Sequence, residues 1–416
     1  MTPTPPDSRS PRTPHDTPAL VVGAGPVGLA AALALRALEV PVTVLEARSR
    51  DAQRPGSRAL YVHRSSLRLL EQASPGLSRD IAGYGVTWHT RRTLYRGREV
   101  YARSYPPASG DGLPPFTSLR QVETERFLRK AAELAGAHIA WDAEVRDVET
   151  SPDGVRVTAA DGREWSAQYV VAADGARSAV RRAVGIDLGG SRAEGFHLVV
   201  DIADGPEPRP AERVLHYAHP RAGGRHVLTV PFAGGFQIDL QCKEDDPVDK
   251  LTDPDLLKRW LPKVVDPEAI GELLWISQYR FLQVLADRFA DETGRVLLAG
   301  EAAHLFPPFG ARGMNSGITD ADAAAQAIAL ALMAGRTPRA RAAVAAYARD
   351  RRAAAVDNSA AVGAALAHLR PIGWLARTRL TAAGRLAPWV PRLGEWLERA
   401  PYGPRTTSRR KPGPGY

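Results

Sequence analysis

Short apolar runs at four places along the chain have the length and composition of buried β-strands. They are Ala19–Val22, Val42–Leu45, Tyr169–Ala173 and Arg295–Ala299. A strand that is buried on both faces is almost continuously apolar, because it has no polar side to expose. Between the first two runs, Pro26–Leu38 is rich in alanine and leucine and predicts a helix. The order strand, helix, strand predicts a parallel sheet.

Between about residues 190 and 285 the pattern changes to alternating apolar and polar positions. His226–Val230, Phe236–Leu240 and Trp275–Phe281 alternate in this way and are separated by turn-forming residues. The alternation indicates an antiparallel sheet with one polar face. The polar residues expected on that face are His226, either Gln237 or Asp239, and either Gln278 or Arg280. Such a face is a candidate wall for a substrate cavity.

The last third of the chain is predicted to be mainly helical. A loop over Gly300–Gly313 leads into an alanine-rich helix from about Asn315 to Met333, and further helices reach about Glu398. The whole pattern predicts an α/β fold, with a parallel sheet, an inserted and mostly antiparallel sheet, and C-terminal helices.

The composition narrows the class of protein. The chain has 416 residues, of which 44% are hydrophobic and 24% are charged, the ordinary balance of a globular protein. No stretch is long and apolar enough to span a membrane. Met1–Thr17 has no apolar centre, so we expect a disordered tail rather than a secretory signal. The single cysteine, Cys242, excludes an internal disulfide and a multi-cysteine metal site. Together these features favour the cytoplasm.

The net charge of +9 owes much to the C-terminus. Four positive charges lie at Arg405, Arg409, Arg410 and Lys411. Because no aromatic residue alternates with them to stack on bases, we interpret 401–416 as a basic flexible tail and expect no nucleic-acid partner. The remaining excess is mostly arginine and could attract an anionic nicotinamide cofactor or substrate.

A G-x-G-x-x-G pattern joins the first predicted strand and helix. Its glycines are Gly23, Gly25 and Gly28, with Pro26 among them. The first glycine allows a tight turn, the second lets the backbone approach a pyrophosphate, and the third lets the helix pack closely. The pyrophosphate then lies at a helix N-terminus, which favours anions. Glu46 ends the second strand, where a carboxylate can accept hydrogen bonds from ribose hydroxyls. These residues predict a dinucleotide site, but they do not distinguish a site for NAD from a site for FAD.

Two further motifs follow predicted strands. Residues 172–181 read AADGARSAVR and contain Asp174 and Gly175, and residues 300–315 read GEAAHLFPPFGARGMN. With the glycine turn, these motifs resemble those of the single-component FAD-dependent aromatic hydroxylases, the family typified by para-hydroxybenzoate hydroxylase. The resemblance covers about residues 18–350. Within the family, the run Tyr279–Asp320 is most similar to the hydroxylases of phenylpropionate-type phenols.

The resemblance implies roles for residues of the late motif. Glu301 would bind the ribityl hydroxyls of FAD. Arg312, together with the helix N-terminus near Gly313, would stabilise negative charge on the reduced flavin. Pro307 and Pro308 have no N–H and would wall a dry pocket for the reaction with oxygen. The other residues implied to contact FAD are Arg58, Gln121, Asp174, Gly175, Gly300, Met314 and Asn315.

Each of these roles has a simpler alternative. Arg58 could be a surface arginine, and Arg312 could point to solvent and pair with an acid such as Asp320. His304 is interpreted as structural rather than as a general base. The histidines at 197, 216, 219 and 226 are too scattered along the sequence to propose a metal site.

The chain departs from the family at two places. Glu301 stands where the family has an aspartate, and its extra methylene could weaken the hold on the ribityl chain. Ala323–Ala327, with Gln326, stands where the family helix carries an asparagine and a Trp-Lys pair. The second change should alter packing rather than chemistry.

The implied fold is a Rossmann-like, glutathione-reductase-type FAD-binding sheet with an inserted substrate-binding sheet. We expect a disordered tail over 1–17, a discontinuous FAD-binding domain over 18–185 and 286–345, a substrate-binding sheet over 186–285, and C-terminal helices over 346–400.

The implied activity is that of an FAD-dependent monooxygenase. NAD(P)H would reduce FAD, and reaction with O2 would give a flavin C4a-hydroperoxide that hydroxylates a small aromatic, phenolic molecule. The alternatives are a related flavoprotein that performs epoxidation, Baeyer–Villiger oxidation or reduction, and a non-catalytic FAD-binding relative.

Overall fold

The four buried runs lie side by side in one sheet of a computed structural model, which describes residues 15–52, 59–105, 112–243, 246 and 252–404. They form β1 (His15–Val22), β2 (Val42–Leu45), β10 (Glu164–Ala172) and β16 (Val296–Leu298). β1 pairs with β2 and β10, and β10 pairs with β16, all in parallel. The predicted parallel sheet is therefore confirmed.

Three further strands complete this seven-stranded sheet. The strand order is β7-β2-β1-β10-β9-β8, with β16 beside β10. The added strands are β7 (His138–Ala140), β8 (Val145–Thr150) and β9 (Val155–Ala159). β8 and β9 pair with each other in an antiparallel hairpin.

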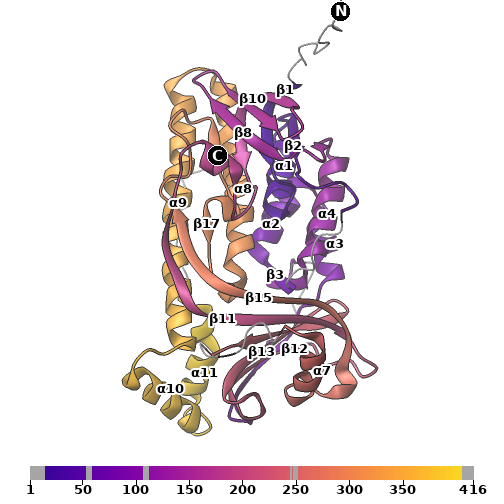
Figure 1. Cartoon of the computed structure of the whole chain (residues 1–416), viewed down its shortest axis with the longest axis vertical. Helices are drawn as coiled ribbons and strands as arrows, with labels where there is room; N and C mark the ends of the chain where they lie inside the picture. Colours follow the sequence, from indigo (N-terminus) through magenta and orange to yellow (C-terminus); the bar gives the residue numbers. More distant parts are fainter. Residues whose placement is uncertain (1–14, 53–58, 106–111, 244–245, 247–251, 405–416) are drawn as a thin grey trace, which may run out of the picture.

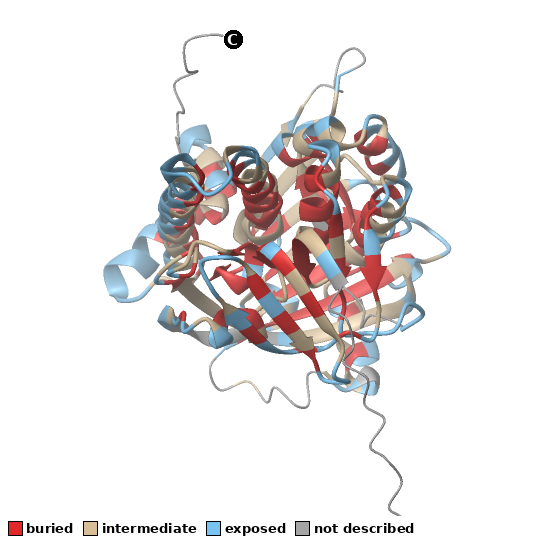
Figure 2. Ribbon diagram, turned by 90° about the horizontal axis from the view of Figure 1, so that it is seen from above, coloured by how far each residue is buried: buried red, intermediate tan, exposed pale blue. Residues whose placement is uncertain are grey.

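Helices cover this sheet and build the main core with it. α1 (Pro26–Ala37) packs against both α4 (Gln121–Leu134) and α8 (Arg312–Ala334). The buried faces are mostly alanine, valine and leucine, and Figure 2 shows that the helices carry both buried and exposed residues. Burial of this apolar surface is the main driving force for the fold. Smaller helices here are α2 (Arg64–Ala73), α3 (Leu77–Tyr84) and α5 (Ala179–Ala183).

A second sheet of eight strands has the order β17-β15-β11-β14-β13-β12-β4-β5. All of its neighbours pair antiparallel except β12 and β4, which are parallel. Figure 1 shows its two longest strands, β11 and β15, curving side by side across the molecule. Its strands are β4 (Thr90–Tyr95), β5 (Arg98–Ser104), β11 (Leu188–Asp204), β12 (Glu212–His219), β13 (Arg225–Phe232), β14 (Gly235–Gln241), β15 (Ile270–Ala286) and β17 (His304–Leu305). A separate pair consists of β3 (Ala59–His63) and β6 (Phe116–Arg120).

One face of the second sheet is apolar and the other is more polar, as the alternation predicts. On β14, Phe236, Ile238 and Leu240 join an apolar cluster with α7 (Pro254–Trp260). The intervening Gln237 and Asp239 belong to the opposite face of the strand, because successive side chains alternate. That polar face looks toward the first sheet and its helices, so it is the face available to a substrate cavity.

The C-terminal part is helical, as predicted. α9 (Pro338–Leu369) runs along one side of the molecule, and α10 (Trp374–Leu386) and α11 (Pro391–Arg399) follow it (Figure 1). The short 3-10 helices are η1 (Pro220–Ala222), η2 (Leu261–Lys263), η3 (Pro267–Ala269), η4 (Gly300–Ala302), η5 (Phe309–Ala311) and η6 (Ala400–Tyr402).

Several boundaries expected from the sequence were wrong. β1 begins at His15, inside the expected tail over 1–17, because the strand extends along β10. Residues 90–104 form β4 and β5 of the second sheet, whereas the sequence predicts them in the FAD-binding domain. The expected boundary between 345 and 346 falls inside α9. The expected flexible tail begins too early, because η6 places Pro401 and Tyr402 in the folded part.

Candidate functional site

The three glycines of the dinucleotide turn meet three different surroundings. Gly23 has φ +100°, and a Cβ there would lie 2.5 Å from the carbonyl oxygen of Ala173. A Cβ on Gly28 would lie 1.8 Å from the carbonyl oxygen of Gly23, so helix and turn touch at this point. At Gly25 a Cβ would meet nothing within 4 Å. The open backbone at Gly25, next to the N-terminus of α1, is the surface that a pyrophosphate needs.

Glu46 is held against this turn. It is 8% exposed and follows β2 directly. Its Oε2 accepts a hydrogen bond of 2.7 Å from the Ala24 N–H, and its Oε1 accepts one of 3.2 Å from the Arg48 N–H. These contacts fix the carboxylate at the carboxyl edge of the sheet, beside the glycine turn.

Asp174 and Gly175 form the second predicted element, directly after β10. Asp174 Oδ2 accepts from the Val180 N–H at 3.1 Å, which fixes the carboxylate near the start of α5. Its Oδ1 is buried and has no hydrogen-bond partner among the described residues. Burial raises the pKa of the Asp174 carboxyl. A buried oxygen without a partner fits a hydroxyl group of a bound cofactor.

The third element, from Gly300 onward, approaches the first closely. Gly300 has φ +60°, and a Cβ there would lie 2.9 Å from the Val27 side chain on α1. Glu301 lies in η4, and it is exposed. The three elements therefore meet at one edge of the parallel sheet, and their residues fit FAD.

The expected effect of Glu301 can be tested by shortening it. Glu301→Asp should retain or improve FAD affinity, whereas Glu301→Ala should weaken it, because one charged hydrogen bond is worth about 1.5–3 kcal/mol. Titration of the ligand-free protein with FAD measures both. Glu292→Ala, which removes a nearby exposed glutamate bonded to Arg288, is the matched control. Unchanged affinity in Glu301→Ala would remove this side chain from the site.

The following segment places its two prolines differently. Pro307 is buried, while Pro308 is half-buried and lines a cavity with η5. α8 begins at Arg312, earlier than expected. Gly313 and Met314 lie in its first turn, and a Cβ on Gly313 would meet nothing within 4 Å.

The side chain of Asn315 forms hydrogen bonds with other groups of the protein. Its Nδ2 donates to the carbonyls of Tyr61 at 3.0 Å and Ala311 at 2.7 Å. Its Oδ1 accepts from the His63 N–H at 2.8 Å and the Ser66 hydroxyl at 2.7 Å. The side chain therefore ties α8 to β3 and α2, and the contact of Asn315 with the cofactor stays a prediction.

Gln121 and Arg58 complete the predicted set. Gln121 is the first residue of α4, and its Nε2 donates to Glu125 Oε1 at 2.9 Å. Its proposed contact with the flavin stays a prediction. Arg58 lies outside the described residues.

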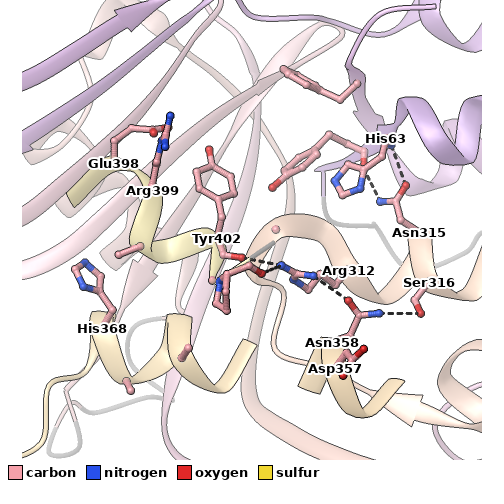
Figure 3. A pocket seen from close by; sticks show the side chains of 18 of the residues that line it. His63, Arg312, Asn315, Ser316, Asp357, Asn358, His368, Glu398, Arg399 and Tyr402 are labelled. Carbon is pink, nitrogen blue, oxygen red and sulfur yellow. Dashed lines mark hydrogen bonds between the residues drawn. The ribbon is translucent and has the colours of Figure 1, made fainter. Parts of the chain in front are cut away.

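Arg312 is anchored to the C-terminal segment. Its Nη1 donates to Asn358 Oδ1 at 2.9 Å, and its Nη2 donates to the carbonyls of Tyr402 at 3.1 Å and Pro404 at 3.0 Å (Figure 3). All of these acceptors are neutral, and burial lowers the pKa of the guanidinium. The alternative pairing of Arg312 with Asp320 is wrong.

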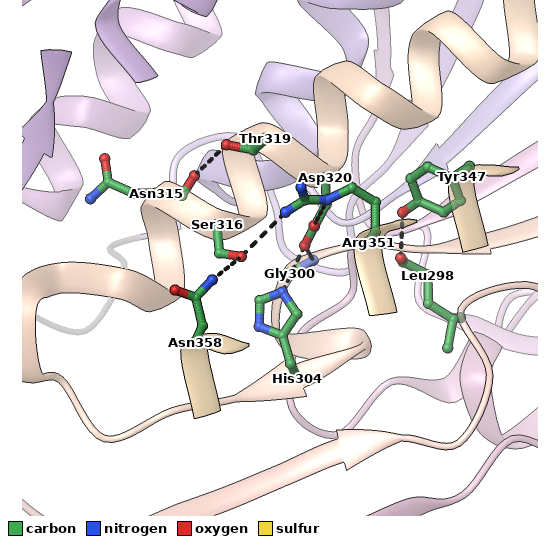
Figure 4. Close-up of polar contacts among 10 residues, drawn as sticks. All are labelled: Leu298, Gly300, His304, Asn315, Ser316, Thr319, Asp320, Tyr347, Arg351 and Asn358. Carbon is green, nitrogen blue, oxygen red and sulfur yellow. Dashed lines mark hydrogen bonds and ion pairs between the residues drawn. The ribbon is translucent and has the colours of Figure 1, made fainter. Parts of the chain in front are cut away.

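The partners of Asp320 are Arg351, His304 and Gly300 (Figure 4). The carboxylate accepts from Arg351 Nε at 2.6 Å and from the Gly300 N–H at 3.1 Å, and it shares a 2.7 Å hydrogen bond with His304 Nε2. His304 and Asp320 are both 0% exposed. This network joins η4, β17, α8 and α9, which agrees with the structural interpretation of His304.

The second sheet supplies one wall of a cavity. Its polar face contributes His197, His226, Gln237 and Asp239, so the predicted wall is present at these positions. Pro308–Ala311 lies opposite. The remaining lining residues are Tyr61, Arg213, Leu215, Leu228, Val230, Gln241, Leu369, Pro401 and Tyr402. A larger cavity of about 1410 Å³ adjoins it and shares Tyr61, Gly310 and Tyr402 (Figure 3).

Two histidines that are far apart in the sequence, His197 and His226, both line this cavity. His197 Nδ1 and Asp239 Oδ1 are 2.6 Å apart, and both side chains are largely buried. His226 Nδ1 accepts from the Ala218 N–H at 3.0 Å, and burial lowers the pKa of His226 to about 4. Within the described ranges, no group of three His, Cys, Asp or Glu residues is arranged to hold a metal ion.

No sequence pattern indicates three of the lining residues, Tyr61, Arg213 and Tyr402. They come from β3, β12 and η6, which are distant in sequence and meet only in the fold.

No described helix is long and apolar enough to cross a membrane.

A dinucleotide turn, a half-buried aspartate after β10 and a polar cavity beside the third element together fit an FAD-binding protein whose second sheet lines that cavity. The family of FAD binding domains matches residues 16–360. The chain belongs to this family, and FAD is its cofactor.

Two curated relatives are similar over most of this chain. A 3-(3-hydroxy-phenyl)propionate/3-hydroxycinnamic acid hydroxylase of Mycobacterium avium is 31% identical over 74% of the chain and 54% of its own length. A 6-methylpretetramide 4-monooxygenase of Streptomyces rimosus is 32% identical over 73% of the chain and 54% of its length. The chain therefore spans about half the length of these curated relatives.

The fold is also similar to that of a solved structure. p-Nitrophenol 4-monooxygenase PnpA from Pseudomonas putida DLL-E4 superposes with a TM-score of 0.76 at 21% identity. The match covers 94% of this chain and 100% of that chain. The predicted fold class is confirmed.

Proposed function

We propose that the protein is an FAD-dependent monooxygenase that uses NAD(P)H and O2 to hydroxylate a small phenolic molecule. The observation that carries this proposal is the cavity between the polar face of the second sheet and Pro308–Ala311. That segment continues directly from the third FAD element, so a substrate in the cavity would lie beside the cofactor. A cytoplasmic location, expected from the composition, belongs to the same proposal.

Bound FAD would supply the redox chemistry with NAD(P)H and O2. The chain's own residues hold and enclose the reactants. Gly25, Glu46 and Asp174 would bind the cofactor at the edge of the parallel sheet. Pro308, which has no backbone N–H, and Phe309, which has an apolar side chain, line the cavity. Both limit the hydrogen-bonding sites for water there.

The His197–Asp239 pair is suited to handling a proton. An ionised Asp239 accepts a hydrogen bond from Nδ1–H, which leaves Nε2 as the basic atom of the imidazole. A phenol in the cavity could then transfer its proton to Nε2, and the carboxylate would stabilise the imidazolium. A deprotonated phenol is electron-rich, as a ring that is to be hydroxylated must be.

The names of the relatives support a phenolic substrate. They are a hydroxylase of hydroxyphenylpropionate and a monooxygenase of a pretetramide, and the structural neighbour is a monooxygenase of p-nitrophenol.

The experiment is a turnover assay on FAD-loaded protein with a panel of phenols. NADH or NADPH oxidation, O2 uptake and product mass are measured together, with 18O2 to trace the oxygen atom. The proposal expects one labelled oxygen in an aromatic product. Reductant oxidation that yields only hydrogen peroxide with every phenol, or an oxygen inserted next to a carbonyl, would contradict hydroxylation.

Arg312 provides a test of the cofactor's surroundings. Arg312→Ala should lower the reduction potential of bound flavin and slow its reduction, because a nearby positive charge favours the anionic reduced form. FAD should stay bound, since Gly25 and Glu46 lie elsewhere. Potentiometric titration measures the effect, and Asn358→Ala is the control, because it removes one Arg312 partner without changing charge. An unchanged midpoint in Arg312→Ala would place this cation away from the flavin.

A further inference from the structure

The helix α10 carries large apolar side chains on its outer side, where they are exposed. Leu375 and Leu386 are separated by about three helical turns, so both point to the same side of the helix. The opposite side, with Leu380 and Ala383, is buried in an apolar cluster that includes residues of β4, β12 and α11. Figure 1 shows α10 at one end of the molecule, beside α11.

The exposed apolar group extends past both ends of the helix. Ile372, before the helix, is 91% exposed, and Trp374 in the first turn is 72% exposed. After the helix, the N–H groups of Trp389 and Val390 both donate to the Leu386 carbonyl at 3.0 Å, which keeps these two residues next to Leu386. We define the α10 face as Ile372, Trp374, Leu375, Leu386, Trp389 and Val390. Exposed apolar groups of this kind mark a surface that binds another surface.

Only positive charges accompany the α10 face along the chain. Between Asp357 and Glu395 the sequence contains no acid. The same stretch contains Arg370, Arg377, Arg379, Arg385 and Arg392. In the ranges that the structure describes, none of these arginines forms an ion pair, and Glu395 itself pairs with Arg399 and Arg103.

The neighbouring turn between β4 and β5 adds to the positive charge. Arg96 and Arg98 are exposed there, and the guanidinium carbon of Arg98 lies 5.7 Å from the centre of the Trp389 ring. The acid of this turn, Glu99, pairs with Arg92 at 2.7 Å. The α10 face is therefore apolar and has a cationic border.

The charge of the α10 face decides between the surfaces that could cover it. A symmetric pair of copies would place the arginines of one copy opposite those of the other, and like charges in contact are unfavourable. The side chains of residues 405–416 carry only positive charges as well. A single-stranded nucleic acid would neutralise the arginines and stack on the tryptophans, but it offers no apolar layer to Ile372, Leu375 and Leu386. A bilayer with anionic phospholipids offers both an apolar layer and phosphates.

The large cavity reaches the surface beside the α10 face. Ala376 and Arg379 of α10 are exposed and line it, together with Trp396 and Arg399 of α11. The same cavity adjoins the smaller one and shares Tyr61, Gly310 and Tyr402 with it. A bilayer docked on the α10 face would therefore lie beside an entrance to both cavities.

We propose that the α10 face docks the protein on the surface of a bilayer that contains anionic phospholipids. The tryptophans and the aliphatic side chains enter the edge of the apolar layer, while the arginines contact the headgroup phosphates. This attachment is peripheral and reversible. The proposal goes beyond the proposed function and does not depend on it.

Vesicle flotation of the FAD-loaded protein tests the proposal. The vesicles contain phosphatidylcholine alone, or phosphatidylcholine with phosphatidylglycerol as the anionic lipid. The wild type should bind the anionic vesicles and should bind the neutral vesicles less. Trp374→Ser/Leu375→Ser should weaken binding to anionic vesicles about tenfold or more, because burial of one leucine side chain alone corresponds to about that factor. Arg377→Gln/Arg385→Gln should also weaken it about tenfold or more, since each arginine at an anionic surface corresponds to a factor of about five.

Two matched controls make the same chemical changes elsewhere on the surface. Leu134→Ser/Met333→Ser removes two exposed apolar side chains from α4 and α8. Arg336→Gln/Arg349→Gln removes two exposed arginines that pair with acids. Both controls should bind anionic vesicles like the wild type. The FAD content and melting temperature should stay unchanged in all four variants, because every altered side chain is exposed.

Trp374→Phe distinguishes insertion into the bilayer from electrostatic adhesion to its surface. Phospholipids with brominated acyl chains quench the fluorescence of a tryptophan that enters the apolar layer. Anionic vesicles of such lipids should quench the wild type more than Trp374→Phe. The variant should still bind these vesicles, because phenylalanine is also apolar. Equal quenching of the two proteins would show that this residue stays outside the bilayer and would overturn the proposed orientation.

Other results would overturn the proposal as a whole. They include no binding of the wild type to anionic vesicles, and binding that survives Trp374→Ser/Leu375→Ser. Self-association in lipid-free solution that this double variant abolishes, measured by sedimentation velocity, would assign the α10 face to a second copy of the chain. Binding of a single-stranded oligonucleotide that the same variant abolishes would assign it to nucleic acid. Vesicle binding is measured without turnover, so absence of hydroxylated product would reject the proposed function alone.

Discussion

Replacing Gly25 with valine should leave the protein folded but unable to retain FAD. Gly25 has φ −75° and ψ −179°, a conformation that any residue adopts, so valine introduces no backbone strain. A Cβ there meets no protein atom within 4 Å. The added side chain would instead occupy the space needed by the pyrophosphate and block the N–H groups at the start of α1.

The expected loss is large. Two charge-assisted hydrogen bonds are worth about 3–6 kcal/mol together, which corresponds to roughly a 100-fold to 10,000-fold weaker affinity. The flavin content of the purified variant and a titration with FAD measure the loss, and circular dichroism checks the fold. Gly83→Val is the matched control, because a Cβ at Gly83 also meets nothing within 4 Å. Stoichiometric flavin in Gly25→Val would show that the cofactor does not pass this turn.

The parts of the site that lie within one short segment could be predicted, because the sequence of that segment determines their geometry. The turn from Gly23 to Gly28 joins β1 to α1, and both the positive φ of Gly23 and the contact of Gly28 with the Gly23 carbonyl arise within this short segment. The alternation in β13 and β14 likewise predicts which side chains share a face, since the strand period is two residues. His226, Gln237 and Asp239 line the cavity for that reason.

The pairing of His197 with Asp239 could not be predicted from the sequence, because it depends on the order of strands in the sheet. β11 neighbours β14 rather than β12, its successor in sequence. Residues 197 and 239 therefore meet across strands that are separated by two others along the chain. No spacing in the sequence indicates this contact, because register between distant strands depends on tertiary packing.

The composition of the C-terminal end does not indicate its contacts, for a related reason. Its proline, glycine and arginine content is typical of a solvated tail, yet Tyr402 is half-buried and lines the cavity. Two arginines, Arg91 and Arg213, lie 5.0 and 4.7 Å from the centre of its ring. The Tyr402 carbonyl also accepts from Arg312. These partners lie on β4, β12 and α8, so the order of this segment depends on contacts that composition does not contain.

The second large effect is expected at Asp320, where substitution by alanine should strongly destabilise the fold. The carboxylate is fully buried and is bonded to Arg351, His304 and the Gly300 N–H. Removing it leaves the partly buried Arg351 guanidinium, the His304 imidazole and the Gly300 amide without this acceptor. Removing one partner of a buried ion pair typically costs about 3–5 kcal/mol. Asp320→Asn should cost less, because it keeps the shape and one acceptor oxygen.

Chemical denaturation of the FAD-free protein measures this cost without the contribution of bound cofactor. Asp322→Ala is the matched control, because Asp322 lies on the same helix and accepts a surface hydrogen bond from Gln326. A loss for Asp320→Ala no larger than for Asp322→Ala would contradict the structural role of the network.

The effect of Asp320 should also depend on pH in a defined direction. Burial opposes ionisation, but His304 and Arg351 outweigh it and hold the pKa of Asp320 below its usual value. A carboxylate whose pKa is lowered on folding adds stability at pH values above its ordinary pKa and loses it as the pH falls through the lowered value. The free energies of unfolding of wild type and Asp320→Ala should therefore differ most near neutral pH and converge in acid. A difference that stays constant from pH 7 down to about pH 3 would show that lost packing, rather than the lost charge, causes the destabilisation.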